Sequence, residues 1–177
     1  MRRSAVPAEL VLHPMNFEDA LRDQNLLAEG EIHSGDLRVE VWTDRGRRGV
    51  LYSERESLQL FFRVNRSAWV RIIYVLQNGM QVPIEDGYHV TPPLANRVIE
   101  YPGSFEVVPP FGIEHIYATA FTEEPPPLST RRVMLAGEPY EIIADGMDSL
   151  VRTRGLRRKA DAQISESYVT VTTTPAD

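Results

Sequence analysis

The sequence predicts an all-β protein, an antiparallel β-sandwich of immunoglobulin-like or jelly-roll-like type with one or two short peripheral helices. Three observations predict this class. Segments rich in β-branched and aromatic residues recur along the chain, turn-forming residues separate them at short spacing, and helical periodicity is confined to two short stretches. Counting these segments gives about eight or nine strands, which is typical of a sandwich or a barrel.

The amino-acid composition excludes some classes of function and disfavours others. With 177 residues the chain is one ordinary domain, long enough to bury roughly 70% of its unfolded surface. It has no cysteine, which excludes disulfides, thiol nucleophiles and thiolate metal sites. A net charge of -6 disfavours nucleic acid as a partner, and the absence of an apolar run of roughly 20 residues disfavours direct membrane insertion.

The chain is expected to divide into an extension, residues 1–35, and one sandwich domain, residues 36–177. The extension has one helical candidate beginning at Asn16, which can cap a helix with Asp19 at the third helical position. The domain is expected to open with a strand over 37–43, where aliphatic residues occupy every second position.

The centre of the chain predicts an antiparallel meander. Strands are predicted over 57–64 and 68–76 from their aromatic and β-branched residues, with a short polar turn between them. Asn78-Gly79 is the pair best suited to two successive positive φ angles, so we expect a type I′ hairpin with Gln77 opposite Met80.

The second half continues the pattern of short strands and turns. Residues 83–87 are expected to form a connection, and the remaining strands are predicted at 88–90, 97–101, 104–108, 114–121 and 163–174. Residues 133–135 and 140–143 are short and ambiguous, while 145–154 has helical spacing and ends at Gly155.

Two charged or proline-rich segments have a structural and a functional interpretation. The loop 44–49 has three arginines, which would suit an anion site but are more often exposed loop charge. The Pro-rich arm, residues 123–127, is weak as a signature for an SH3-type partner; a stiff spacer leading out of the sheet is favoured.

No catalytic constellation is recognisable, so the sequence predicts no catalytic residue, cofactor or metal site. The histidines have no ligand spacing, and there is neither a Gly-rich phosphate loop nor a G-x-S-x-G elbow. The acidic pairs Glu85-Asp86 and Glu123-Glu124 consist of adjacent residues, which point to opposite faces of a strand and cannot easily share one proton.

Aromatic residues are the one class of side chain that suggests a binding site. They would form a stacking platform for sugars if they shared a face, although aromatics on strands are usually core or cross-strand pairs. The candidates are Trp42, Trp69, Tyr74, Tyr88 and Tyr101. Of these, Trp69, Tyr88 and Tyr101 are the predicted ligand-binding residues of an alternative, small-ligand or glycan-binding function.

A series of short motifs runs along the chain in a recognisable order. They are Val39-Glu40-Val41-Trp42-Thr43, Tyr52, the strand from Leu58 to Val64, Ala68-Trp69-Val70, Tyr74, Asn78-Gly79 and Pro110-Phe111-Gly112-Ile113-Glu114. In these motifs the chain from Leu37 to Phe121 resembles an uncharacterised bacterial domain family that occurs beside caspase-like peptidases, Ser/Thr protein kinases and cell-envelope lipoproteins. The tail, with Thr153-Arg154-Gly155-Leu156 and Thr172-Thr173-Thr174, also resembles the end of that family. The chain departs from the family at Val82-Pro83-Ile84, where an aromatic-Pro pair is usual.

The resemblance implies a non-enzymatic accessory module that binds another protein, as part of a bacterial envelope or signalling assembly. It alone favours the periplasm or cell surface over the cytoplasm. The expected partner is a protein or a larger assembly, through an exposed strand edge or the Pro-rich arm, and self-association is left open. No site residue is implied, because no catalytic residue is known for the family.

Overall fold

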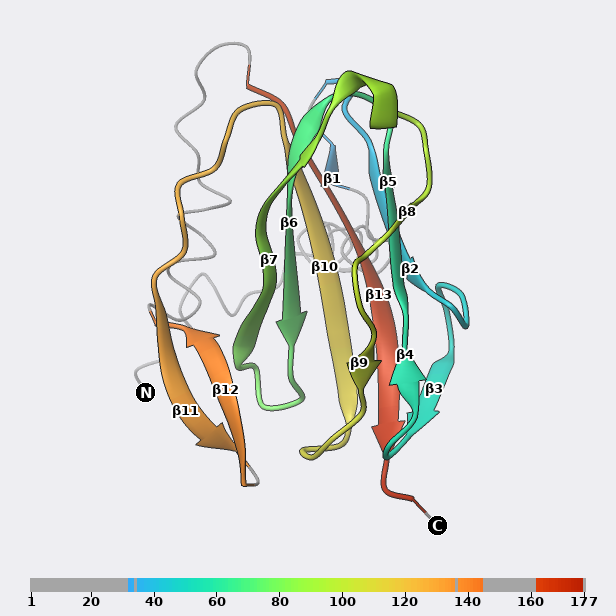
Figure 1. Ribbon diagram of the computed structural model, residues 1–177, viewed down its shortest axis with the longest axis vertical. Coiled ribbons are helices and arrows are strands. Elements are labelled where there is room, and N and C mark those ends of the chain that lie inside the picture. Colours follow the sequence, from blue (N-terminus) through green and yellow to red (C-terminus); the bar gives the residue numbers. More distant parts are fainter. Residues whose placement is uncertain (1–31, 34, 136, 145–161, 177) are drawn as a thin grey trace, which may run out of the picture.

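The computed structural model describes residues 32–33, 35–135, 137–144 and 162–176. Two layers of β-sheet face each other across an apolar core, which confirms the predicted all-β sandwich (Figure 1). The helices predicted from Asn16 and over 145–154 fall outside the described residues. Within them the helical element is a single 3-10 turn, η2 (Pro92–Leu94).

The larger sheet has six strands in the order β1-β13-β10-β6-β7, with β3 also paired to β13. Its pairs are antiparallel except β3 with β13, which run parallel. The strands are β1 (Ile32–His33), β13 (Ile164–Thr174), β10 (Ile113–Phe121), β6 (Ala68–Val75), β7 (Gln81–Val90) and β3 (Val50–Ser53).

The opposite layer consists of a three-stranded sheet, in the order β2-β5-β8, and the short pair β4-β9. A separate hairpin, β11-β12, stands beside the edge strand β7 and contacts it through β12 (Figure 1). The strands are β2 (Val39–Thr43), β5 (Leu60–Val64), β8 (Ile99–Glu100), β4 (Ser57–Leu58), β9 (Phe105–Glu106), β11 (Thr130–Leu135) and β12 (Glu138–Ile143).

The core lies between the layers and follows the two-residue period of the strands. β2 alternates buried and half-buried residues along its whole length, as its sequence predicts. The core also contains side chains of different size: the large Phe62 of β5 and the small Ala118 and Ala120 of β10, all of them fully buried. Alternating large and small side chains in this way lets facing strands pack without voids.

The predicted meander is wrong in its first half. Residues 57–64 form two strands, β4 and β5, because the backbone of Gln59 bonds to a loop: its N–H donates to Asp44 Oδ1 (2.9 Å), and its carbonyl accepts the Asp44 N–H (3.0 Å). The two strands join different sheets, and so do β5 and β6. The turn at 65–67 is therefore a crossing from one layer to the other.

The hairpin between β6 and β7 exists, but its loop is one residue longer than predicted. Leu76, not Gln77, faces Met80: the Leu76 N–H donates to the Met80 carbonyl (2.9 Å), and the Gly79 N–H donates to the Leu76 carbonyl (2.8 Å). A type I′ turn needs two positive φ angles, whereas here Gly79 (φ 80°) has one and Asn78 does not. The Asn78 side chain instead accepts the Met80 N–H (2.9 Å).

The connection predicted over 83–87 is strand, because β7 continues through it. Pro83 is tolerated since β7 lies at the edge of its sheet, where a missing donor costs no central hydrogen bond. The pairing with β6 shifts register on either side of Ile72, which marks bulges. The strand is thus irregular at the positions that looked like a loop.

Two of the three arginines of the loop 44–49 pair with nearby carboxylates, which agrees with the exposed-charge interpretation. Arg45 forms a two-pronged pair with Glu56, each N–O distance being 2.9 Å. Arg47 lies 3.2 Å from Glu40. Both arginines are well exposed, so these pairs contribute little to stability.

The Pro-rich arm folds back on the sheet, contrary to the spacer prediction. Arg71, buried on the outer face of β6, has its Nε 2.7 Å from Asp86 Oδ1, although this contact is not aligned as a hydrogen bond. Its guanidinium also donates to the carbonyl of Pro126. Asp86 in turn accepts the N–H of Leu128 (2.7 Å). A buried cation that needs acceptors thereby holds the arm against the sheet.

We expect Arg71→Leu to lower the free energy of unfolding by about 3 kcal/mol, because it leaves Asp86 and the Pro126 carbonyl without their cation. Arg63→Leu, which removes an exposed ion pair with Glu40, should cost less than about 1 kcal/mol. Urea unfolding of the two variants measures both values. Equal losses would contradict the structural role of Arg71.

Candidate functional site

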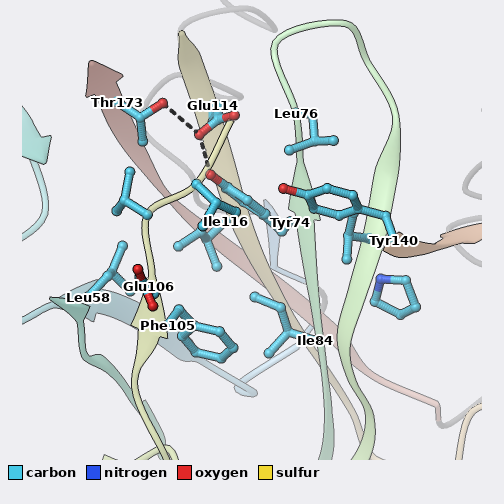
Figure 2. A pocket seen from close by; sticks show the side chains of 14 residues that line it. Leu58, Tyr74, Leu76, Ile84, Phe105, Glu106, Glu114, Ile116, Tyr140 and Thr173 are labelled. Atoms are coloured by element: carbon cyan, nitrogen blue, oxygen red, sulfur yellow. Dashed lines mark hydrogen bonds between the residues drawn. The ribbon is translucent and has the colours of Figure 1, made fainter. Parts of the chain in front are cut away.

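A cavity of about 300 Å³ lies between the two layers at the end where β4 and β9 pair. Most of its wall is apolar, with Leu58 and Phe105 from the smaller layer, and Leu76, Ile84 and Ile116 from the larger sheet. Figure 2 shows Phe105 and Ile84 at one end of the cavity and a polar group at the other. This combination of apolar wall and few polar groups is the usual composition of a small-molecule site.

The polar group is centred on Glu114, whose side chain is 1% exposed. Its Oε2 accepts hydrogen bonds from the hydroxyls of Tyr74 and of Thr173, the latter at 3.2 Å (Figure 2). Its Oε1 is equally buried but has no hydrogen-bond partner among the residues that the structure describes. Within the described residues, one oxygen of this carboxyl thus accepts two hydrogen bonds and the other accepts none.

The pairing of three strands brings these residues together. Glu114 begins the inward-facing series of β10 that continues with Ile116 and Ala118, so the pleat directs it into the core. In the register of the sheet, Tyr74 of β6 lies opposite Ile116, one inward position from Glu114. Thr173 of β13 lies one inward position beyond Val171, the partner of Glu114. All three side chains therefore share one face.

Burial dominates the electrostatics of this group. Burial raises the pKa of Glu114, against the opposing effect of the hydrogen bonds from Tyr74 and Thr173. The pKa of the Tyr74 phenol is raised far above its ordinary range, first by burial and then by the neighbouring Glu114. Tyr74 is consequently a fixed hydrogen-bond donor, and Glu114 holds a proton to higher pH than an exposed glutamate does.

The wall of the cavity also includes two residues from outside the central strands. Tyr140 of β12 lines it and donates its hydroxyl to the carbonyl of Pro109 (3.0 Å). Burial raises the pKa of Tyr140, and the carboxylates of Glu114 and Glu138 raise it further. Glu106 of β9 also lines the cavity but is exposed. The β11-β12 hairpin therefore supplies part of the wall.

The aromatic residues predicted to bind a ligand do not form one platform. Trp69 stacks on His89 (ring centroids 4.3 Å apart), whereas Tyr88, the residue before that histidine, packs edge-on against the buried Phe62 (5.3 Å). Because adjacent residues of a strand face opposite sides, Trp69 and Tyr88 lie on opposite faces of the larger sheet. Tyr101 belongs to a third aromatic pair, with Phe105.

Tyr101 lies next to the cavity without lining it. Its ring stacks on Phe105, a wall residue, with centroids 5.8 Å apart. Its hydroxyl donates to the carbonyl of Ile84 (3.1 Å). The other two aromatic candidates are also separated, because Trp42 stacks on Phe61 (6.2 Å) and Tyr74 binds Glu114. Of the five, the structure places Tyr74 in the site.

A different aromatic group gathers on the outer face of the larger sheet. Tyr117 and Tyr168 are direct partners across the β10-β13 pair, with ring centroids 5.2 Å apart, and His115 packs edge-on against Tyr168 (5.7 Å). Burial lowers the pKa of His115, whose Nδ1 lies 3.1 Å from Thr170 Oγ1. The sequence did not single out this group, since only the pairing of distant strands assembles it.

Neither a metal centre nor a membrane span is found in the part of the chain that the structure describes. No three His, Asp or Glu side chains within it are grouped as metal ligands. It also contains no helix with the length and apolarity required to span a bilayer. No family model, curated protein or solved structure matches the chain, so the family resemblance of residues 37–121 stays a prediction.

We expect Glu114→Gln to remove one pH-dependent component of stability. The unfolded chain ionises Glu114 near its ordinary pKa of 4.5, whereas the folded protein holds the proton more tightly. The contribution of Glu114 is therefore fully present below that pH and is lost as the pH rises through the folded pKa. The difference in unfolding free energy between wild type and Glu114→Gln, measured in urea at a series of pH values, should shift in favour of the variant as the pH rises. Glu106→Gln, which alters an exposed carboxylate, is the control, and a pH-independent difference for Glu114→Gln would contradict the assignment.

Proposed function

We propose that this protein is a non-enzymatic binding module whose cavity holds a small, largely apolar molecule. The observation that carries the proposal is the carboxyl of Glu114, buried at one end of an apolar cavity with Oε1 lacking a partner in the described structure. A buried polar atom left unsatisfied costs about 1–3 kcal/mol. A bound molecule that supplies the missing hydrogen bond offsets that cost.

The arrangement of the polar group supports binding in preference to catalysis. Tyr74 and Thr173 both donate to the same oxygen of Glu114, which fixes the carboxyl in place and does not activate a nucleophile. The volume of about 300 Å³ is at the lower end of the range for ligand pockets. A molecule with one polar end and an apolar body suits the polar and apolar ends of this cavity.

We expect Ile84→Trp to fill the cavity and abolish fragment binding, because Ile84 lies in its wall and is only half-buried. Leu51→Trp is a matched control, since Leu51 is 52% exposed on β3 and does not line the cavity. Ligand-observed NMR with a library of small aromatic and aliphatic fragments measures binding to each protein. Fragments that bind all three proteins equally, or none of them, would refute the proposal.

The setting proposed for this activity is a bacterial envelope or signalling assembly, outside the cytoplasm. Its support is the resemblance of residues 37–121 to a family found beside peptidases, kinases and lipoproteins. In such a setting a binding module would act as an accessory subunit that reports or retains a small molecule for its neighbours.

A second candidate function, binding of another protein, is favoured by the open edge of the β11-β12 hairpin. Among the described strands β11 pairs only with β12, so its other edge is available to an added strand. Met134 on β11 is 65% exposed, which places an apolar side chain along that edge. Arg131 and Arg132 flank this part of the strand and are also exposed, a common protection of free edges.

A photo-crosslinking residue introduced at position 134 should give one adduct of discrete mass in extracts of the native cells, if the edge binds a protein. The same residue at position 98 is the control, because Val98 is also apolar and 58% exposed but lies far from β11 in the sequence and outside the strands. Adducts that are identical at both positions, or absent at 134, would remove this candidate.

A further inference from the structure

We propose that the cavity ligand is an organic cation, an ammonium group attached to an apolar body, which pairs with the carboxylate of Glu114. This inference rests on the proposed binding function and specifies the chemical class of its ligand. The residues that carry it are the two carboxylates of the cavity, the unsatisfied oxygen of one of them, and the aromatic rings around it.

The cavity lining carries two carboxyl groups and no cationic side chain. The carboxyl groups are those of the buried Glu114 and the exposed Glu106, and the described lining contains no Arg, Lys or His. An anionic ligand would be repelled by both carboxylates without any compensating cation. A cation meets complementary charge at both carboxylates.

The hydrogen bonds of Glu114 also favour an N–H donor. Oε2 accepts from Tyr74 and Thr173, two bonds that stabilise the charged form of the carboxyl. Oε1 has no donor in the described structure. An ammonium N–H directed at Oε1 would supply the missing bond and the missing counter-charge together, and charge-assisted bonds of this kind are roughly twice as strong as neutral ones.

The aromatic residues of the wall suit the same ligand. Tyr74, Tyr140 and Phe105 contribute rings to a cavity of about 300 Å³, and ring faces attract cations most strongly where water is excluded. In Figure 2 Tyr74 and Tyr140 lie near the Glu114 end, whereas Phe105 lies toward the opposite end beside Ile84. A cationic head next to Glu114 would therefore extend its apolar body toward Phe105.

Binding of a cation should be linked to release of a proton. In the empty cavity burial favours the protonated carboxyl, and the groups that face Glu114 are Tyr74 from β6, Thr173 from β13 and Tyr140 from β12. When the ammonium binds, Glu114 gives its proton to the buffer and the ion pair replaces the neutral acid. Affinity should then rise with pH until Glu114 is ionised in the free protein.

The test compares three molecules of similar shape by isothermal titration calorimetry: 2-phenylethylamine, 2-phenylethanol and 3-phenylpropionate. We expect the amine to bind at least about tenfold more tightly than the alcohol, and the carboxylate to bind most weakly. Repeating the amine titration in buffers of different ionisation enthalpy should show release of up to about one proton on binding.

Two variants assign the effect to a residue. Glu114→Gln keeps the shape of the side chain and should remove both the preference for the amine and the proton release. Glu100→Gln is the matched control and should retain both the preference for the amine and the proton release, because Glu100 is exposed on β8 and does not line the cavity. Thermal unfolding of each variant shows that it is folded.

The outcomes separate this inference from the proposal on which it rests. If the alcohol binds as tightly as the amine and Glu114→Gln changes nothing, the cation assignment is wrong, whereas small-molecule binding stands. If none of the three molecules binds and the fragment library is also negative, both are wrong. Amine binding that survives in Ile84→Trp would place the amine elsewhere and likewise refute the assignment.

Discussion

The pairing of β10 with β13 is the constraint on which the rest of the molecule depends. Nine consecutive pairs, from Ile113 with Thr172 to Phe121 with Ile164, join segments that are more than forty residues apart. The other strands of the larger sheet attach to either side of this pair. Its pleat fixes which side chains enter the core, and it directs Glu114 and Thr173 to the same face at one end. The cavity therefore follows from the register of a single ladder, since a shift by one residue would turn Glu114 out to solvent.

Much of the fold could be predicted, because strand formation is a local property. The strands at 37–43, 68–76, 114–121 and 163–174 follow from alternation and β-branched residues alone. Which strand pairs with which, in contrast, is not determined by the residues of the strand alone. Nothing within 57–64 indicates that Gln59 would bond to Asp44 and divide the segment between two sheets. The hairpin loop also differs from the prediction, because it has one more residue and Asn78 accepts the Met80 N–H through its side chain instead of adopting a positive φ.

The candidate site was less accessible to sequence reasoning, although one signal was present. The alternation of Ile116, Ala118 and Ala120, extended two residues back, reaches Glu114 and places a carboxylate in the core. Glutamate is almost never fully buried without a partner, so this position marks a functional candidate. The remaining parts of the cavity come from strands far apart in the sequence, including Tyr140 in a segment with ambiguous periodicity. Their convergence is a property of the packed sandwich and of no single stretch of residues.

Contacts of Arg71 and Asp86 hold the chain at Pro126 and Leu128 against the sheet. These contacts limit how the length of the segment before β11 can change. They anchor the segment that leads into β11-β12, and that hairpin carries Tyr140 in the cavity wall. Surface loops usually accept insertions and deletions at low cost. Between Phe121 and Thr130 a change of length would instead move Tyr140 relative to the rest of the cavity wall, so the length of this tract determines the shape of the cavity.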